Sequence, residues 1–389
     1  MDMRTGLPVV GMVGGGQLAR MTHQAAIALG QSLRVLATGP DDGAARVAAD
    51  VHFGQPDDLA ALRRFAKGCD VVTFDHEHVP GEHIQALAAA GETVYPSAEA
   101  LRYAQDKLAM RVRLSELGLP VPRWRAVTTT ADVGELAAGS SWPVVVKSVR
   151  GGYDGRGVWV VGNRDEAAAR IAEAQAAGVE LLVEERLPLR RELAVQLARS
   201  PFGQVAVYPV VETVQQDGVC VEVLAPAPGL AESEALEIQE LAIRIATELD
   251  VVGMLAVELF DSEYGIMVNE LAMRPHNSGH WTIEGARTSQ FEQHLRAVLD
   301  YPLGETRMTA PAVAMANVLA PSIRPGEQPL DERLHYLFAA EPDVKVHLYG
   351  KDLRPGRKIG HVTALGEDPG EVRARAARAV TLLRDGRST

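Results

Sequence analysis

The chain has little that could form a disulfide, a redox centre or a nucleic-acid-binding surface. Its two cysteines, Cys69 and Cys220, are far apart and form no metal or redox motif, which fits a reducing cytoplasm. The formal net charge of −12 argues against a nucleic-acid partner. The apolar run from Val9 to Val13 is too short, and too close to glycines, for a signal peptide or a membrane span.

The length of 389 residues predicts two or three domains, and a charged content of 23% is typical of a globular protein. Residues 8–13 form a predicted first strand, followed by a glycine turn and a helix that ends near Gly30. Leu33 to Ala37 is a predicted second strand. The helix carries one apolar face, made of Leu18, Met21 and Ala25. This unit is of the Rossmann type, and the helix start at Gly16 and Gln17 is a natural anion site.

A dinucleotide is a poor fit to this unit. Ala19 stands where the third glycine of the dinucleotide motif belongs, and no acid follows Ala37 to hold a ribose. The strand predicted at residues 70–75 ends in two acids and two histidines, but alternation separates Asp75 and Glu77 from the histidines. A polar crevice wall is therefore favoured over a metal site. A further strand over residues 94–97 and one helix over residues 98–117 are expected to follow.

The most informative stretch combines a buried strand, a lysine and a run of glycines. Val144 to Val146 is a β-branched run typical of a buried strand, and Lys147 follows it. Successive backbone N–H groups in a glycine-rich turn form a concavity that binds anions. The glycines are Gly151, Gly152, Gly155 and Gly157.

The polar residues within this loop favour a nucleotide-phosphate loop over a plain surface hairpin. A simple turn does not need polar or charged side chains such as those of Tyr153, Asp154 and Arg156. The lysine precedes the glycines and a strand-like segment, residues 158–161, follows them, so the loop is not a Walker A motif. Strand, loop and strand with an upstream lysine resemble the ATP-grasp superfamily, in which a flexible hairpin closes over the triphosphate.

Farther along, residues 181–187 form a predicted strand that runs into a hinge-like segment, which could pair with an adenine edge or be a plain edge strand. Strands are expected over residues 192–199, 205–211 and 219–224. An amphipathic helix over residues 234–249 is expected to point four side chains at the core: Leu236, Leu241, Ile245 and Leu249.

Two apolar strands, residues 254–260 and 266–271, each contain one acid. A hairpin turning near residue 263 places Glu258 and Glu270 within about one diagonal of each other. Two carboxylates in an apolar setting repel unless a cation lies between them. Mg²⁺ prefers one or two carboxylates together with phosphate oxygens, so the pair favours a magnesium site over a solvated acidic face.

Two later segments are suited to anions. Arg274, His276 and Asn277 lie in a turn that could hold a small oxyanion. A helix over residues 288–299 and a linker over residues 302–311 follow. Strands at 313–319, 344–349 and 358–364 and a final helix at 369–383 complete the chain. A basic loop between the last two strands is either an anion site or a solvated turn; it contains Lys351, Arg354, Arg357 and Lys358.

Taken together, these segments resemble the 5-(carboxyamino)imidazole ribonucleotide synthetase family, ATP-grasp enzymes of purine biosynthesis. The matching segments span nearly the whole chain in order. They are residues 14–21, 105–107, 151–157, 269–270, 274–280 and 354–361. The departures are Asp75 where glutamate is expected, Ala19 for glycine, Met273 for proline, and Glu212 where some relatives have a histidine.

The resemblance implies a mixed α/β and α+β fold in three parts. A Rossmann-like pre-ATP-grasp domain covers residues 1–104, an ATP-grasp domain covers 105–304 with a lid at about 122–190, and a small β-rich domain covers 305–389. It also implies a cytoplasmic homodimer with two Mg²⁺ ions at Glu258 and Glu270. The residues implied to bind ATP are Arg102, Lys107, Lys147, Gly152, Tyr153, Asp154, Gly155, Arg156, Gly157, Val158, Glu184, Glu185, Arg186, Leu187, Glu192, Glu212, Asn269 and Glu270.

The implied reaction converts ATP, bicarbonate and 5-aminoimidazole ribonucleotide to ADP, phosphate and the N-carboxylated ribonucleotide. Carboxyphosphate is the implied intermediate. The implied catalytic residues are Tyr153, Asp154, Arg156, Arg274, His276 and Asn277. The implied ribonucleotide-binding residues are Gly16, Gln17, Asp75, Glu77, Lys351, Arg354, Arg357 and Lys358. The alternatives are an ATP-grasp ligase with another acceptor and a non-catalytic or NAD-dependent nucleotide-binding protein.

Overall fold

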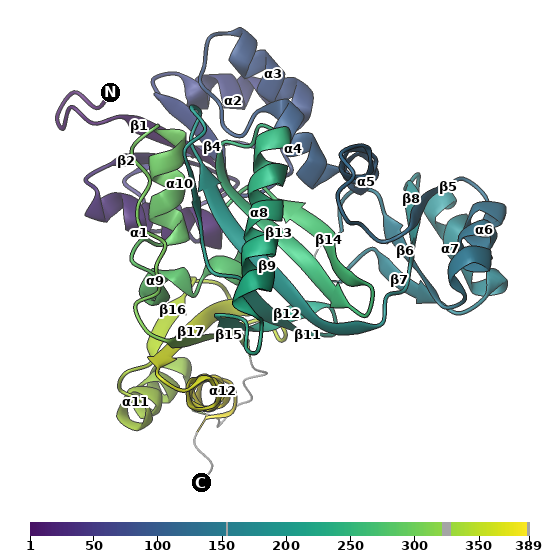
Figure 1. The fold of residues 1–389 in the computed structure, drawn as a ribbon. Helices are drawn as coiled ribbons and strands as arrows, with labels where there is room; N and C mark the ends of the chain where they lie inside the picture. The colour runs from purple at the N-terminus through teal and green to yellow at the C-terminus, as the bar shows by residue number, and fades with distance from the viewer. Residues whose placement is uncertain (153–154, 321–327, 387–389) are drawn as a thin grey trace.

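A computed structural model describes residues 1–152, 155–320 and 328–386. The chain begins with a parallel sheet in the order β3-β2-β1-β4, which confirms the Rossmann-like start (Figure 1). Every residue of β1, whose sequence is VVGMV, is buried, as expected for an interior strand of a parallel sheet that is covered on both faces. The strands are β1 (Val9–Val13), β2 (Ser32–Ala37), β3 (Asp50–Phe53) and β4 (Val71–Phe74).

The helices of this domain are α1 (Gln17–Ala28), α2 (Leu59–Ala66) and α3 (Gly81–Ala89). Leu18, Met21 and Ala25 of α1 pack together against Phe291 and Tyr349, as the apolar face predicts. The strand predicted at residues 94–97 is wrong: Val94 forms only an isolated bridge with Val72. Pro96, which has no backbone N–H to donate, prevents the pairing from continuing.

The single helix predicted over residues 98–117 is also wrong, because it is two helices, α4 (Ala98–Gln105) and α5 (Lys107–Glu116). Asp106 between them has an extended backbone, and its side chain accepts a hydrogen bond from the N–H of Ala109. It is therefore the N-cap of α5. The break places Lys107 in the first turn of a new helix.

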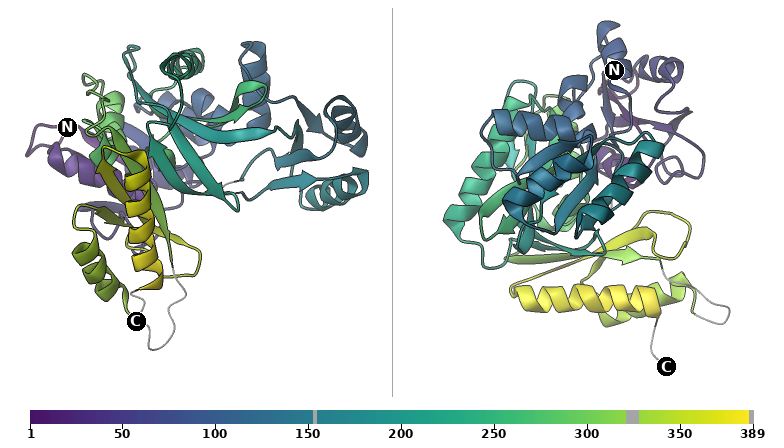
Figure 2. Two further views of the ribbon diagram at one scale, coloured as in Figure 1. Left: turned by 60° about the horizontal axis from the view of Figure 1, so that its bottom comes forward. Right: turned by 90° about the vertical axis from the view of Figure 1, so that its right-hand side faces the viewer.

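A separate antiparallel sheet projects from the body of the molecule with two helices packed on it (Figure 2). Its strand order is β5-β8-β6-β7, and residues 124–185 contain all of it. Val144, Val146 and Val183 pack in its core with residues of both helices, so the β-branched run is buried as predicted. The elements are β5 (Trp124–Val127), α6 (Thr130–Ser140), β6 (Val144–Ser148), β7 (Val158–Val161), α7 (Arg164–Ala176) and β8 (Leu181–Glu185).

The central sheet runs in the order β14-β13-β9-β11-β12-β15-β17-β16, with β10 paired to the outer part of β9. One strand was predicted over residues 205–211, but the chain forms β10 and β11 with a break at Tyr208 and Pro209. Pro209 cannot donate a ladder hydrogen bond, which explains the break. The strands from the ATP-grasp part are β9 (Leu189–Arg199), β10 (Val205–Val207), β11 (Val211–Gln216), β12 (Val219–Ala225), β13 (Gly253–Ser262) and β14 (Gly265–Ala272).

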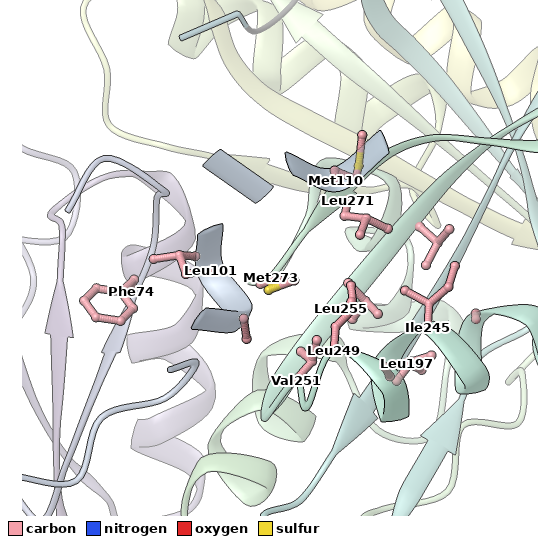
Figure 3. Packing of buried hydrophobic residues seen from close by; sticks show 14 of the residues in the cluster. Phe74, Leu101, Met110, Leu197, Ile245, Leu249, Val251, Leu255, Leu271 and Met273 are labelled. Carbon is pink, nitrogen blue, oxygen red and sulfur yellow. The ribbon is translucent and has the colours of Figure 1, made fainter. Parts of the chain in front are cut away.

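Helix α8 (Glu232–Glu248) covers one face of this sheet, and Ile245 and Leu249 point into the core (Figure 3). Leu236 was expected beside them but is 53% exposed, whereas Ile238 is buried. Two residues correspond to about 200° around a helix, so these two side chains point in nearly opposite directions. The same cluster joins Phe74 and Leu101 to Leu271 and Met273, so the first domain and the central sheet share one core.

The C-terminal strands do not form a sheet of their own. β15 (Ala312–Leu319) pairs with β12, and β17 (Lys358–Gly366) and β16 (Lys345–Leu348) continue the central sheet. Helix α11 (Leu330–Ala340), which the sequence did not predict, packs beside α12 (Pro369–Asp385). The described helices include none with the length and apolar character needed to cross a bilayer.

Candidate active site

The centre of the site is a pair of glutamates on the β13–β14 hairpin. Glu258 and Glu270 are direct cross-strand partners, nearer than the predicted diagonal, and a register shift follows Glu258. Burial and the neighbouring charges of Glu270 and Glu192 raise the pKa of Glu258 to about 8. The pair therefore carries a repulsion that a nearby cation would relieve.

Two lysines from different elements reach this hairpin. The Nζ atom of Lys107, in the first turn of α5, lies 2.9 Å from Oε1 of Glu270. The Nζ atom of Lys147, on β6, lies 2.7 Å from Oε2 of Glu184 and donates to Oδ1 of Asn269 at 3.1 Å. The predicted phosphate-binding lysines therefore converge on the strand that carries Glu270.

Arg111 belongs to the same network, although the sequence pattern did not single it out. It is 1% exposed, and its Nε donates to Oε1 of Glu184 at 2.6 Å. Its Nη2 donates to the carbonyl oxygen of Asn269 at 2.8 Å. Burial alone would raise the pKa of Glu184, but Lys147 and Arg111 lower it to about 2. A signal was present, because Arg111 is four residues after Lys107 and so lies on the same helical face.

The described part of the glycine loop fits tightly over β6. A Cβ on Gly157 would lie 2.2 Å from Oγ of Ser148, and Gly157 has a φ of +73°, so only glycine is accommodated there. A Cβ on Gly155 would lie 3.0 Å from the Cα of Gly218, which places the loop beside the β11–β12 turn. Arg156 and Val158 are exposed. Tyr153 and Asp154 lie outside the described residues.

The last two residues of β8, Glu184 and Glu185, are both buried. Glu185 accepts hydrogen bonds from the N–H and Nε of Arg123, so its carboxylate is directed away from the lysines. Arg186 and Leu187 follow the last paired residue of the strand. Three more predicted nucleotide residues lie outside the lysine network or at its edge. Burial raises the pKa of Glu192, and Glu212 lies 3.6 Å from Arg191. Arg102 is exposed.

The turn after β14 lies between the glutamate hairpin and the first domain. Nε of Arg274 lies 2.8 Å from Oε1 of Glu77, and Nε2 of His276 lies 3.6 Å from Oε1 of Glu258. Burial, followed by Arg274, lowers the pKa of His276 to about 3, so the imidazole is neutral at physiological pH. Oδ1 and Nδ2 of Asn277 are buried and have no partner within the described ranges. The turn therefore offers a guanidinium, an imidazole and an amide group.

Gln290, the first residue of α10 (Gln290–Val298), fixes the backbone of this turn. Its Oε1 accepts from the N–H of His276 at 2.9 Å, and its Nε2 donates to the carbonyl of His276 at 2.8 Å. The same Nε2 lies 3.0 Å from Nδ1 of His280. A Cβ on Gly279 would clash with Oε1 of Gln290, so the turn is packed closely around this amide.

A contact joins the predicted ribonucleotide residues of the first domain to those of the C-terminal loop. Nζ of Lys351 donates to Oε1 of Gln17 at 2.6 Å, which joins residues 334 positions apart. The N–H of Gly16 donates to Oδ2 of Asp75 at 2.8 Å, so in this structure the amide has a carboxylate as its partner. Burial raises the pKa of Asp75. Two other basic side chains, Arg354 and Arg357, lie 3.5 and 3.8 Å from Asp352, and Lys358 is partly buried.

A divalent cation fits the glutamate pair, provided that a ligand supplies further oxygens. The described residues include no group of three histidine, cysteine or acidic side chains that could hold a metal alone. Glu258 and Glu270 supply two carboxylates, and Asn269 lies beside them on β14. This donor set is of the kind that Mg²⁺ completes with phosphate oxygens and water.

Comparisons with known proteins follow the same three-part order. Residues 7–105 match the ribonucleotide synthetase preATP-grasp domain, residues 112–291 the ATP-grasp domain, and residues 313–375 the phosphoribosylaminoimidazole carboxylase C-terminal domain. The N5-carboxyaminoimidazole ribonucleotide synthase of Mycobacterium tuberculosis H37Rv is 59% identical over 385 residues, which cover 98% of this chain and 89% of that protein.

Two solved structures from Aspergillus clavatus show the same fold over nearly the full length. The carboxyaminoimidazole ribonucleotide synthase complexed with ATP has a TM-score of 0.87 at 32% identity. The N5-carboxyaminoimidazole synthase in complex with ADP and 5-aminoimidazole ribonucleotide has a TM-score of 0.85 at 31% identity. Each comparison covers 97% of this chain and 98% of the other.

Proposed function

The chain belongs to the N5-carboxyaminoimidazole ribonucleotide synthase family, and from that premise we propose how its residues perform the ATP-dependent carboxylation of 5-aminoimidazole ribonucleotide. The observation that carries the proposal is the position of the His276 side chain, whose Nε2 lies 3.6 Å from Oε1 of Glu258. This contact joins the β13–β14 hairpin, which is proposed to bind the metal, to the turn after β14, which is proposed to bind the oxyanion. Phosphoryl transfer and carboxylation can therefore occur in adjoining parts of one site.

ATP binds between the projecting lid and the central sheet. Lys107 and Lys147 neutralise the triphosphate, and the glycine loop, residues 151–157, covers it with backbone N–H groups. The adenine edge pairs with the hinge at Arg186 and Leu187, which follow the end of β8. The same fold in a relative complexed with ATP supports this placement.

Glu258 and Glu270 hold Mg²⁺, with Asn269 as their neighbour. When bound, Mg²⁺ neutralises charge on the phosphate oxygens. Burial, followed by the charges of Glu270 and Glu192, raises the pKa of Glu258, and a cation would relieve the repulsion within this group. Lys107 compensates Glu270 from one side, and its single charge is insufficient for two carboxylates and a triphosphate.

The carboxyl donor is bicarbonate. An oxygen of bicarbonate attacks the γ-phosphorus, the bond to the β-phosphate oxygen breaks, and ADP leaves with the electron pair. Carboxyphosphate is formed next to Arg274 and Asn277, whose guanidinium and buried amide are suited to an oxyanion. The acceptor amine then attacks the carboxyl carbon, phosphate leaves, and the amine loses a proton. Positioning and charge neutralisation supply most of the rate.

The acceptor ribonucleotide lies in the crevice between the first domain and the C-terminal loop. Lys351 and Gln17 hold its 5′-phosphate, and Asp75 and Glu77 form the opposite wall. Arg156 of the glycine loop is exposed and is assigned to the same substrate, as are Tyr153 and Asp154 from the sequence alone. A relative of the same fold in complex with ADP and this ribonucleotide supports the assignment.

Two further properties belong to the proposal. The protein is a homodimer, which light scattering on the purified chain would test. We also assign it to the cytoplasm, a reducing compartment with which the two free thiols of Cys69 and Cys220 are compatible.

ADP release measured with each candidate acceptor tests the function. We expect release to require Mg²⁺ and to be stimulated by 5-aminoimidazole ribonucleotide in the presence of bicarbonate. Glycinamide ribonucleotide and biotin are the matched controls, because other ATP-grasp enzymes would use such acceptors. Stimulation by either control, with none from the aminoimidazole, would overturn the proposal.

A further inference from the structure

Lys147 and Arg111 both pair with the carboxylate of Glu184. Nζ of Lys147 lies 2.7 Å from Oε2 of Glu184, and Nε of Arg111 donates to Oε1 of the same carboxylate at 2.6 Å. The two cations therefore use different oxygens and do not compete for one. All three side chains are less than one-tenth exposed, so solvent screens these charges weakly.

We propose that Arg111 is a positioning residue that keeps Glu184 compensated, so that Lys147 is free to move from this carboxylate to the nucleotide phosphates. This inference rests on the proposed function, in which Lys147 binds ATP. It assigns to Arg111 a role in nucleotide affinity without direct contact with the nucleotide.

The physical reason is the cost of an unpaired buried charge. If Lys147 were the sole partner of Glu184, its transfer to a phosphate would leave a buried carboxylate without a counter-ion. With Arg111 in place, Glu184 keeps one charged hydrogen bond throughout. The three side chains carry a net charge of about +1, which is available to an incoming anion.

Arg111 is well placed to remain fixed while Lys147 moves. Its Nη2 donates to the carbonyl of Asn269 at 2.8 Å, so the guanidinium joins α5 to β14 as well as to β8. Besides Glu184, Lys147 contacts Oδ1 of Asn269 at the longer distance of 3.1 Å, and its Nζ lies 5.6 Å from the centroid of the Phe260 ring. Asn269 therefore contacts both cations, the arginine by its backbone and the lysine by its side chain.

The test is a charge-rescue experiment on nucleotide binding. The dissociation constant of a non-hydrolysable ATP analogue with Mg²⁺ is measured by calorimetry for the intact chain. Arg111→Met should weaken binding by about tenfold or more, the value of a hydrogen bond between charged groups. Adding Glu184→Gln to Arg111→Met should restore most of the affinity, because a neutral amide no longer retains Lys147.

A control on the neighbouring acid separates this role from the general loss of an arginine partner on β8, although in this pair only Glu185 is buried and Arg123 is 56% exposed. Arg123 pairs with Glu185, the next residue of β8, at 2.9 Å, and its Nη1 donates to the carbonyl of Gly139, away from the lysines. Arg123→Met should leave the dissociation constant within about twofold of the wild-type value. If Arg111→Met does not fold, Arg111→Gln replaces it, since glutamine stays polar but carries no charge to compensate Glu184.

Unchanged binding in the folded Arg111 variant would overturn the inference, as would a double variant that binds as weakly as the single one. Lys147→Met distinguishes this failure from that of the proposed function. If Lys147→Met binds the analogue normally, the assignment of Lys147 to the phosphates is wrong. If Lys147→Met weakens binding but the Arg111 variants do not behave as stated, only the role of Arg111 is wrong.

Discussion

Glu258 and Glu270 face each other directly across the β13–β14 hairpin, and each reaches a different functional partner. Glu258 lies near the His276 imidazole, whereas Glu270 pairs with Lys107. The hairpin therefore connects the groups proposed for the carboxyl donor to those proposed for the phosphates.

Removing either carboxylate should abolish turnover without unfolding the chain. Glu270→Ala deletes a proposed Mg²⁺ ligand and the carboxylate that pairs with Lys107, and Glu258→Ala acts in the same direction. ADP release at millimolar Mg²⁺ measures the effect. Glu263→Ala is the control, because Glu263 is exposed in the turn of the same hairpin. Near-normal rates in both active-site variants would show that the hairpin binds no metal needed for turnover.

The raised pKa of Glu258 predicts that the metal-free protein loses stability as pH rises. A glutamate carboxyl ordinarily has a pKa of 4.5, whereas the pKa of Glu258 in the folded protein is about 8. Between these values the folded state holds a proton that the unfolded state has released, so stability falls with increasing pH. Glu258→Gln lacks this titration. Its thermal midpoint relative to wild type should therefore be higher at pH 8 than at pH 5, and an equal difference at both pH values would contradict the shift.

The sequence predicted the chemistry of the site better than its geometry. Lys147, the glycine loop and the two glutamates could be identified because unusual residue types interrupt apolar strands. Their convergence depends on β14 lying beside α5 and β8, which is a tertiary relationship. Arg111 shows this limit: its helical spacing from Lys107 was visible, but nothing local indicated that it would be buried against Glu184.

The errors in the fold have specific causes. The break at Asp106 was overlooked because Gln105 and Lys107 are good helix formers, and a capping aspartate was interpreted as part of a helix. The anion site at Gly16 and Gln17 stays a prediction, and the hydrogen bond from the N–H of Gly16 to Asp75, which comes from a distant strand, could not have been foreseen from the helix start. The join between β12 and β15 could not be predicted, because strand pairing across a long linker leaves no local pattern.

Lys351→Ala should weaken binding of the ribonucleotide and not that of ATP. Lys351 contacts Gln17 of the first domain, so its loss should raise the KM for the ribonucleotide by about tenfold or more. Arg354→Ala should have a smaller effect, since that side chain is 74% exposed and lies near Asp352. Steady-state kinetics with each substrate varied in turn measures both constants.

Lys345→Ala is the control for Lys351→Ala, because Lys345 is an exposed lysine on the neighbouring strand β16. High salt should reduce the difference between wild type and Lys351→Ala if the contact is open to solvent. Equal increases in the KM for ATP and for the ribonucleotide would place the loop at the nucleotide. If neither KM increases, the loop that contains Lys351 is a solvated basic turn.

The final prediction concerns Gln290, whose amide holds both the N–H and the carbonyl of His276. Gln290→Leu should release this turn and lower kcat by about tenfold or more, because small displacements of catalytic groups are costly. The KM for ATP should change little, since the hydrogen-bond partners of Lys107 and Lys147 lie on β8 and β14, outside the turn.

The chain provides a closely matched control on the same helix. Gln293 is also fully buried, and its amide holds the N–H and the carbonyl of Gly304, both at 2.8 Å. Gln293→Leu should therefore lose comparable thermal stability while keeping kcat. If both variants lose kcat in proportion to stability, Gln290 acts only in folding. If Gln290→Leu alone loses kcat and the KM for ATP is preserved, the hydrogen bonds of Gln290 to the backbone of His276 hold this turn in place beside Glu258.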